Sequence, residues 1–449
     1  MTGMNTSTTL ITRLQEVVGA DHVLTDPSVM ASYGRDWTGR WVATPLAVVR
    51  PADTEQVSLV MRVCSGNETV VVPQGGNTGL VGGSVPTTSD AVVLSTSRLV
   101  EHGPIDVTRR QLTVGAGMTI AALHAVASAN GLTYGVDLAA RDAATIGGTV
   151  ATNAGGIRVV HFGDTASQLV GVEAVLPDGE VMSHLAGLPK DSAGYDISRL
   201  LVGSEGTLAV ITAVRVQLRN ALPSARTTAL VGVPTLGRAL ELSNAATSSR
   251  EGLLACEYVD DTGMRLLCDV ASLPHPLSDR WPYYLLLETA GELSLPSDAD
   301  AAIDRRLWAY RERQPEAAST LGLVHSLDVA VPLPCLDDLL AQLPELISPH
   351  RVFTFGHLAE GNLHIQVAGP EADDDAVTDR VLRAVADLGG SISSEHGIGR
   401  AKTEYLHLCR DAAQLGAMRR IKQAIDPLGI LNPGVLFTSP PPSTATMSS

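Results

Sequence analysis

The sequence predicts a two-domain protein of mixed helix and strand, an α+β domain followed by an α/β domain. With 449 residues the chain is too long for one ordinary hydrophobic core, so two or more domains are expected. Short runs rich in β-branched residues fill Pro45–Leu218, separated by Gly, Pro and Asp-Gly turn signals. A polar, proline-marked stretch then precedes a second pattern of helices and strands. We expect a first domain at 1–219, with its core at about 45–218, a second at 220–437, and a disordered tail without apolar pattern at 438–449.

The elements can be assigned in chain order. The predicted strands of the first domain are LAVVRP, TVVVPQ, AVVLS, QLTVGAG, GVEAVLPDGEVM and LAVITAVRVQL. Helices are expected at TEQVSLVMRVCSG, with Thr54 as its N-cap, and at TIAALHAVASANG. In the second domain, helices are expected near Leu236–Ser248 and Ala301–Arg313.

Composition excludes several classes of protein. The formal net charge of −16 argues against nucleic acid or an anionic membrane surface as partner, because both need an excess of Lys and Arg on one face. The five cysteines lie far apart without a C-x-x-C pair, which excludes a thiolate zinc knot or an iron–sulfur cluster and favours buried reduced thiols. No secretory signal and no run of eighteen apolar residues occurs, so we expect no transmembrane segment and a cytoplasmic location.

Three glycine-rich segments indicate a large phosphate-bearing ligand. VVPQGGNTGLVGGSVP, residues 71–86, follows a β-branched run and can turn its backbone N–H groups toward a pyrophosphate. It matches neither G-x-G-x-x-G nor G-x-x-x-x-G-K-[ST], which disfavours a nicotinamide Rossmann site and a P-loop. A merely flexible loop is the alternative. The segments 142–164 and 200–212 also combine glycines with small residues, where a flat ligand could lie against backbone.

In this order the three segments resemble the FAD-binding domain of the vanillyl-alcohol oxidase and p-cresol methylhydroxylase type. GHLAEGNLHIQV, SSEHGIGR and ILNPGVLF resemble the D-2-hydroxyacid dehydrogenase branch, which includes D-lactate dehydrogenases, D-2-hydroxyglutarate dehydrogenases and the flavin subunit of glycolate oxidase. The resemblance covers Tyr33–Phe437. It implies a two-part FAD-binding domain, an α/β substrate (cap) domain and a short C-terminal segment that contacts FAD.

The resemblance also implies which residues bind FAD. They are Pro73, Gly75, Gly76, Asn77, Thr78, Gly79, Gly82, Gly83 and Ser84 for the pyrophosphate, Thr145, Gly148, Asn153 and Gly155 along the cofactor, Glu205 and Ile211 at the adenine end, and Asn432 near the flavin ring. Some relatives tether the flavin through a histidine in the first loop. This loop has none, so the FAD should be non-covalent.

His357 and His364 flank Gly361, and the alternation of NLHIQV predicts a turn leading into a strand. Asn362, His364 and Gln366 should share its polar face. By spacing alone, satisfied or solvent-exposed histidines explain the pattern better than a metal site does, because two histidines seven residues apart are a weak signal. The resemblance implies that His357, His364 and Glu395 are metal ligands, and two imidazoles with one carboxylate suit Zn²⁺ or Mn²⁺ with positions left open for substrate.

His396 is the predicted catalytic base. Oxidation of a 2-hydroxy acid requires removal of the hydroxyl proton while the α-hydrogen leaves as hydride to flavin N5. The alternative is that His396 only orients Glu395. By position in the family pattern, Arg311 should bind the substrate carboxylate as a bidentate cation, and a solvated surface charge is the alternative. Gln366 should also contact substrate.

The side chain of the substrate depends on three positions. In hydroxyglutarate-specific relatives we expect threonine at Pro315, lysine at Ser326 and often asparagine at Gln366. Their absence favours a monocarboxylate with an apolar or neutral side chain.

Four functions are therefore considered. The leading one is a metal-assisted, FAD-dependent D-2-hydroxyacid dehydrogenase that passes electrons to an electron-transfer flavoprotein, a quinone or a similar acceptor. The alternatives are an O₂-dependent oxidase of a sugar, lactone or alcohol, a metal-dependent hydrolase without flavin, and a non-catalytic binding homologue. We also consider a homodimer.

Overall fold

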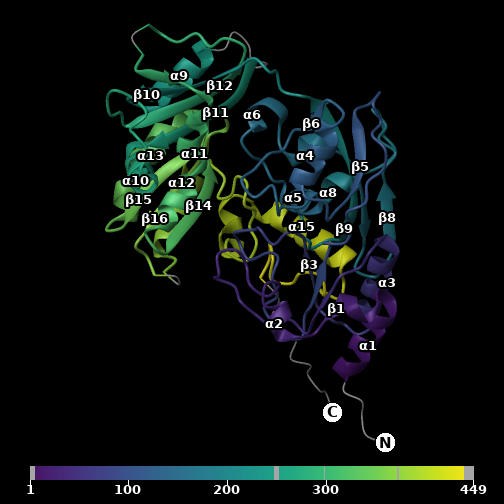
Figure 1. The fold of residues 1–449 in the computed structure, drawn as a ribbon. Coiled ribbons are helices and arrows are strands. Elements are labelled where there is room, and N and C mark those ends of the chain that lie inside the picture. The colour runs from purple at the N-terminus through teal and green to yellow at the C-terminus, as the bar shows by residue number, and fades with distance from the viewer. Residues whose placement is uncertain (1–5, 247–251, 298, 372–373, 439–449) are drawn as a thin grey trace, which may run out of the picture.

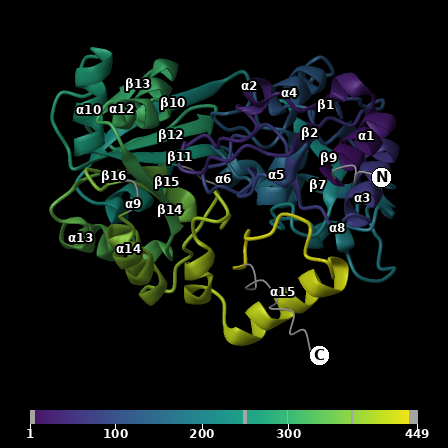
Figure 2. The ribbon, with the colours of Figure 1, turned by 90° about the horizontal axis from the view of Figure 1, so that it is seen from below.

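The computed structural model describes residues 6–246, 252–297, 299–371 and 374–438. It confirms the mixed helix and strand fold and arranges the chain as two halves that lie side by side (Figures 1 and 2). Most of the predicted tail lies outside the described residues. No helix among the residues described here is long and apolar enough to cross a membrane.

The N-terminal half, residues 6–220, contains two sheets. Strands β1 (Val23–Leu24), β2 (Ala47–Val49), β4 (Val92–Ser95) and β3 (Val71–Gln74) form the first, in that order, with the last three parallel. The antiparallel second sheet runs β5 (Gln111–Gly115), β9 (Val210–Asn220), β7 (Leu169–Val175) and β8 (Val181–His184), and β6 (Leu132–Tyr134) also pairs with β9. Its helices are α1 (Thr6–Val18), α2 (Pro27–Met30), α3 (Thr54–Ser65), α4 (Ile120–Ser128), α5 (Ile146–Thr152), α6 (Val159–Phe162), α7 (Thr165–Gln168) and α8 (Ile197–Leu200).

The C-terminal half, residues 226–408, is built on one antiparallel sheet of seven strands. Their order is β13 (Ala301–Ile303), β10 (Arg226–Val233), β12 (Tyr283–Ala290), β11 (Leu253–Asp260), β15 (Arg351–His357), β16 (Asn362–Ala368) and β14 (Val324–Ala330). Helices α9 (Leu236–Ala246), α13 (Leu336–Ile347) and α14 (Ala376–Asp387) contribute to the core on one face. The other face packs on α10 (Asp261–Ala271), α11 (Ala309–Glu312) and α12 (Gln314–Ser319).

The last part of the chain returns to the N-terminal half. Helix α15 (Ala412–Ile425) opens with a capping box at Asp411, and its Ile421 and Ile425 pack on the second sheet. Ile430 and Leu431 then join the core of the first sheet, where Leu431 bridges to Val71. In Figure 1 this yellow segment lies against the N-terminal half.

Two local predictions were wrong. The N-cap of α3 is Asp53, whose carboxylate accepts the N–H of Gln56 at 2.8 Å, and Thr54 is the first helical residue. Residues 301–313 are not one helix: 301–303 form the edge strand β13, and a 3₁₀ turn at Arg305–Trp308 precedes the short α11. Pairing of β13 with β10 outweighs the local helical pattern.

The cysteines are free thiols, as predicted. Cys64 and Cys256 are buried, and burial raises the pKa of each to about 12. Cys268, Cys335 and Cys409 are only partly buried, so burial holds for two of the five.

Candidate functional site

The first glycine-rich segment forms a loop whose backbone is held close to its neighbours. A Cβ at Gly75 would lie 2.3 Å from Oγ1 of Thr145, and one at Gly76 would lie 1.9 Å from the carbonyl oxygen of Ala143. Only glycine fits such approaches. Asn77, at φ 53°, donates its side-chain amide to the carbonyls of Ser32 and Arg35.

This loop offers donors to an anion. Among the residues that the structure describes, no backbone N–H from Gly75 to Ser84 donates to another protein group. A pyrophosphate supplies the acceptors that such a row of N–H groups needs. Thr145 and Gly148 lie beside it, at the start of α5, where the Thr145 hydroxyl accepts the N–H of Gly148 at 3.3 Å. The loop therefore fits FAD.

Other predicted FAD residues have protein partners. Asn153, at φ 52°, donates to Asp164 at 2.8 Å and accepts the N–H of Ala166 at 2.9 Å, so its side chain shapes the following loop. Ile211 is buried in the core of the second sheet. Asn432 donates to the carbonyl oxygens of Gly83 and Glu205, both at 2.8 Å, which places it against the phosphate-binding loop. Its contact with the flavin ring stays a prediction.

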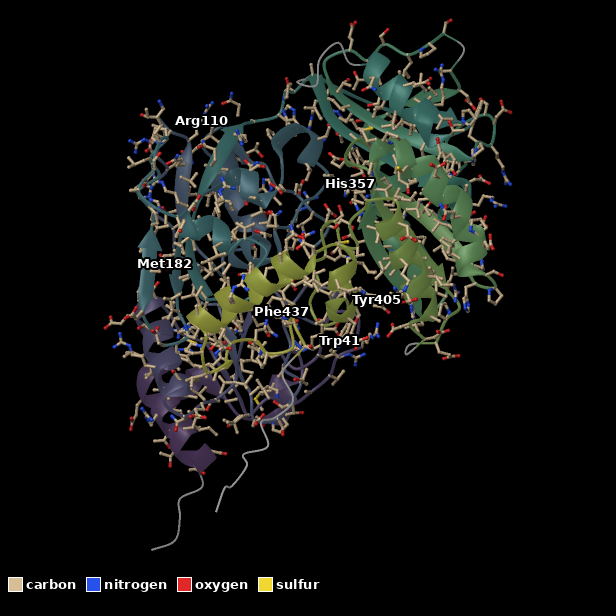
Figure 3. The ribbon with its side chains drawn as sticks, turned by 180° about the vertical axis from the view of Figure 1, so that it is seen from behind. Trp41, Arg110, Met182, His357, Tyr405 and Phe437 are labelled. Carbon is tan, nitrogen blue, oxygen red and sulfur yellow. The ribbon has the colours of Figure 1, made fainter. Side chains whose placement is uncertain are left out.

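The two histidines meet at the end of a β-hairpin. His357 ends β15, a 3₁₀ turn with Gly361 at φ 71° reverses the chain, and His364 lies within β16. Leu363, Ile365 and Val367 pack into the core on the other face, so the predicted alternation is confirmed. Figure 3 shows His357 on the side of the C-terminal half that faces the N-terminal half.

Glu395 completes a group of three side-chain atoms that could bind a metal ion. Oε2 of Glu395 lies 3.6 Å from Nε2 of His357 and 3.9 Å from Nε2 of His364, and the three atoms lie within 4.8 Å of one another. An ion with ligand distances of about 2.0 to 2.2 Å holds tetrahedral ligands roughly 3.4 Å apart, so a small divalent cation fits with little movement. Oε1 of Glu395 accepts the N–H of Gly156 at 2.7 Å, which leaves Oε2 for the ion.

Each imidazole has a carboxylate on its Nδ1 side. Glu257 Oε1 lies 2.7 Å from Nδ1 of His357, and Asp328 Oδ1 lies 3.6 Å from Nδ1 of His364. Such partners orient metal-binding histidines and leave Nε2 free to coordinate. Asp328, His364 and His396 form a second group with metal-ligand spacing. However, Oδ2 of Asp328 already accepts three backbone N–H groups, so a structural role explains Asp328 better.

Charge in the site favours a cation. Burial opposes a charge on His357, but the carboxylates of Glu257 and Glu395 outweigh it and raise its pKa well above the ordinary value. Burial would also raise the pKa of Glu395, but His357 and His364 outweigh it and lower that pKa to about 2. Burial lowers the pKa of His364 to about 3. The imidazole of His364 is therefore neutral, and a divalent ion on Nε2 of His357 would have to displace a proton from that nitrogen.

The candidate base and the candidate substrate cation adjoin this group. The ring of His396 stacks on that of His364, with centroids 5.8 Å apart. Arg311 is buried, which excludes a solvated surface charge. Its Nε donates to Oε2 of Glu257 at 2.8 Å, and its guanidinium lies over the ring of Phe355. Arg311 therefore reaches the site, and Glu257 links it to His357.

The three positions that were expected to distinguish substrate side chains carry no charge. Ser326 pairs with Gln366 across strands β14 and β16, and its hydroxyl donates to Oε1 of Gln366 at 2.7 Å. Pro315 lies in the first turn of α12.

Sequence reasoning missed Glu257, Asp328 and Lys402. Each is buried, and a lone carboxylate inside an apolar strand, as in LLACEYV and SLDVAV, is the signal that could have found the first two.

Comparisons with known proteins agree with this geometry. Residues 45–184 match a family described as FAD binding domain, and residues 222–436 match one described as FAD linked oxidases, C-terminal domain. The D-2-hydroxyglutarate dehydrogenase of Xanthomonas citri pv. viticola is 36% identical, over 95% of this chain and 96% of that protein. The mitochondrial D-2-hydroxyglutarate dehydrogenase of Danio rerio is 35% identical, over 91% and 82%. The D-2-hydroxyglutarate–pyruvate transhydrogenase of Saccharomyces cerevisiae is 30% identical, over 93% and 92%.

Solved structures share the fold. A 4-ethylphenol oxidase from Gulosibacter chungangensis superposes with a TM-score of 0.76 at 18% identity, over 98% of each chain. Substrate-bound p-cresol methylhydroxylase superposes with a TM-score of 0.74 at 14% identity, over 97% of this chain and 98% of that one.

Proposed function

Because this chain belongs to the FAD-linked oxidases, as an FAD-dependent D-2-hydroxyacid dehydrogenase, we propose that it oxidises a D-2-hydroxy acid with a divalent metal on His357, His364 and Glu395 and with His396 as base. In this proposal residues 1–219 bind FAD, and residues 220–437 hold the metal and the substrate and end in a segment that contacts FAD. The convergence of three ligand atoms within 4.8 Å of one another carries the proposal.

When bound, FAD supplies the hydride acceptor, and Zn²⁺ or Mn²⁺ supplies a Lewis acid toward the oxygens of the substrate. The residues of the protein position the substrate and accept its hydroxyl proton. Glu257 holds His357 so that Nε2 faces the ligand group. Arg311, desolvated beside Glu257, offers its remaining guanidinium N–H groups to the substrate carboxylate. His396 receives the hydroxyl proton, since its ring lies beside a metal ligand and its backbone is fixed on Asp328.

We propose a monocarboxylate with a neutral side chain as the preferred substrate. The supporting observation is the Ser326–Gln366 hydrogen bond, which offers a neutral polar surface and no second cation for a distal carboxylate. D-2-hydroxyglutarate is the second candidate, because it is the substrate in the names of several relatives.

The electron acceptor is proposed to be a separate molecule, an electron-transfer flavoprotein or a quinone. The relatives' names favour a dehydrogenase over an O₂-dependent oxidase, and the FAD-binding half argues against a hydrolase without flavin. A cytoplasmic location and a homodimer stay proposals.

Anaerobic bleaching of the flavin tests the function. The FAD-loaded protein is mixed with D- and L-lactate, D- and L-2-hydroxybutyrate, and D- and L-2-hydroxyglutarate, with and without a chelator. We expect bleaching by D-isomers only, fastest with a monocarboxylate, and none after chelation. If D-2-hydroxyglutarate bleaches the flavin fastest, it replaces the monocarboxylate as the proposed substrate. No bleaching by any acid, or equal bleaching after complete metal removal, would refute the proposed function.

A further inference from the structure

The loop that carries Glu395 and His396, residues 393–399, is held by one buried carboxylate from each half of the protein. On the C-terminal side, Oδ2 of Asp328 accepts the backbone N–H groups of Ser394, Glu395 and His396 at 3.0, 2.6 and 2.9 Å. From the N-terminal half, the carboxylate of Glu205 accepts the N–H groups of Ile398 and Gly399 at 2.8 and 2.7 Å. Five of the six backbone N–H groups from 394 to 399 thus point at two carboxylates.

Glu205 is held in place on its own side. It adopts φ 50°, a left-handed conformation that costs free energy for a residue with a side chain, and Gly206 follows at φ 70°. Asn432 donates its side-chain amide both to the carbonyl oxygen of Glu205 and to that of Gly83. The turn at Glu205 is therefore linked through Asn432 to the phosphate-binding loop, while its carboxylate binds the 393–399 loop.

A buried lysine completes the arrangement. Lys402 is almost fully buried, and its Nζ donates to the carbonyl oxygens of Ile392 and Asp328, at 2.9 and 3.3 Å. Burial raises the pKa of Glu205 to about 7, and the two N–H groups and Lys402 act against that rise. Burial would raise the pKa of Asp328, but His396, His364 and then Lys402 outweigh burial and lower that pKa. One cation therefore stabilises the carboxylates on both sides of the loop.

We propose that Glu205 is a positioning residue that couples the FAD-binding half to the metal site by fixing the 393–399 loop. Loss of its acceptors would loosen the loop at Ile398 and Gly399, while Arg400 and Ala401 stay hydrogen-bonded to the carbonyl oxygen of Val81. Glu395 and His396 would then sample positions away from His357 and His364. The sequence resemblance placed Glu205 at the adenine end of FAD, whereas its carboxylate here is occupied by the loop. The inference rests on the proposed function, since it assigns Glu395 to the metal and His396 to the proton.

Glu205→Gln tests the inference with the least change of shape. The amide keeps one oxygen but turns an NH₂ donor toward either Ile398 or Gly399, so one loop N–H loses its acceptor. Glu205→Gly removes both acceptors and relieves the positive φ, which keeps the test open if the glutamine variant does not fold. Glu173→Gln is the control: this carboxylate of the same half accepts from the hydroxyls of Thr54 and Thr212 and touches no residue of the loop.

Three quantities are measured on the FAD-loaded proteins: FAD content, the Kd for Zn²⁺ from competition with a chelator, and the limiting rate of anaerobic flavin reduction by the best acid. For Glu205→Gln we expect parental FAD content, a Kd for Zn²⁺ raised about tenfold, and a reduction rate lowered by about 10- to 100-fold. Excess Zn²⁺ should restore metal content but only part of the rate, because His396 is displaced as well. Glu173→Gln should match the parent.

A parental Kd for Zn²⁺ together with a parental rate in both Glu205 variants would overturn the inference. Loss of FAD in proportion to the loss of rate would also overturn it, in favour of direct FAD binding by Glu205. The proposed function fails separately, and the inference with it, if the parent protein binds no Zn²⁺ or is reduced by no 2-hydroxy acid.

Discussion

At the residue scale, each imidazole of the site owes its role to a neighbouring side chain. Glu257 fixes Nδ1 of His357, and Asp328 lies beside Nδ1 of His364, so both Nε2 atoms face Oε2 of Glu395. The backbone N–H of His396 donates to Asp328. The ring of His396 is not part of the group formed by His357, His364 and Glu395. A ligand and a base should therefore respond differently to mutation.

His396→Ala or His396→Asn should lower the rate of flavin reduction by roughly 10²- to 10⁴-fold, because a positioned proton acceptor is lost while FAD and metal remain bound. His357→Ala should instead lose metal first, and excess Zn²⁺ should offset part of the defect. Metal content and anaerobic reduction rate are measured for both. If a His396 variant keeps its metal and its flavin is reduced at the parental rate, His396 is not the base and only orients Glu395.

At the element scale, the turn between α5 and α6 approaches the loop that carries Glu395. The N–H of Gly156 binds Oε1 of Glu395, and a Cβ at Gly155 would lie 2.4 Å from the same oxygen. Gly155 was predicted to line FAD. In the structure it sets how closely the two halves approach at Glu395.

Gly155→Ala should weaken metal binding about tenfold or more, because the added methyl group displaces the carboxylate of Glu395. Zn²⁺ affinity is compared with that of Gly416→Ala, a substitution inside α15 where a Cβ would meet only the flexible guanidinium of Arg420, at 3.4 Å. FAD content is measured alongside. Unchanged Zn²⁺ affinity in Gly155→Ala would show that Oε1 of Glu395 is not held against this turn.

At the scale of the whole molecule, the predicted FAD loop and the candidate metal ligands lie in different halves. The loop at Gly75–Ser84 follows β3, whereas His357 and His364 belong to the seven-stranded sheet. The two sites should therefore be separable by chemistry that acts on only one of them.

Exhaustive chelation should abolish turnover and leave FAD bound, since the metal ligands contribute nothing to the phosphate-binding loop. Zn²⁺ or Mn²⁺ should restore the activity. Flavin absorbance, metal content and turnover are followed together. Full activity without metal would contradict the metal assignment and favour the oxidase alternative.

Acid denaturation should release all of the FAD into the supernatant, because the residues from Gly75 to Ser84 include no histidine to tether it. Flavin absorbance of the washed precipitate measures this. Flavin that stays with the precipitated protein would contradict non-covalent binding.

The sequence by itself determined what depends on local pattern. The glycines of the 75–84 loop, the alternation of NLHIQV and the histidines on either side of Gly361 are adjacent in the chain, so their spacing already predicted a phosphate loop and a hairpin. The resemblance to a family supplied the roles, since spacing alone did not separate metal ligands from structural histidines.

Only the tertiary structure decided which distant residues complete the site. Glu257, Asp328 and Glu205 are far from Glu395 in the chain, and strand pairing and the contact of the two halves bring them to His357 and to the 393–399 loop. Strand pairing with β10 also made residues 301–303 an edge strand, against their local helical pattern. Local pattern encodes the periodicity of an element. It does not encode which buried carboxylate accepts a hydrogen bond from which N–H group. The tertiary structure decides the pairing, because a buried N–H group loses its hydrogen bonds to water and must bond to the nearest protein acceptor instead.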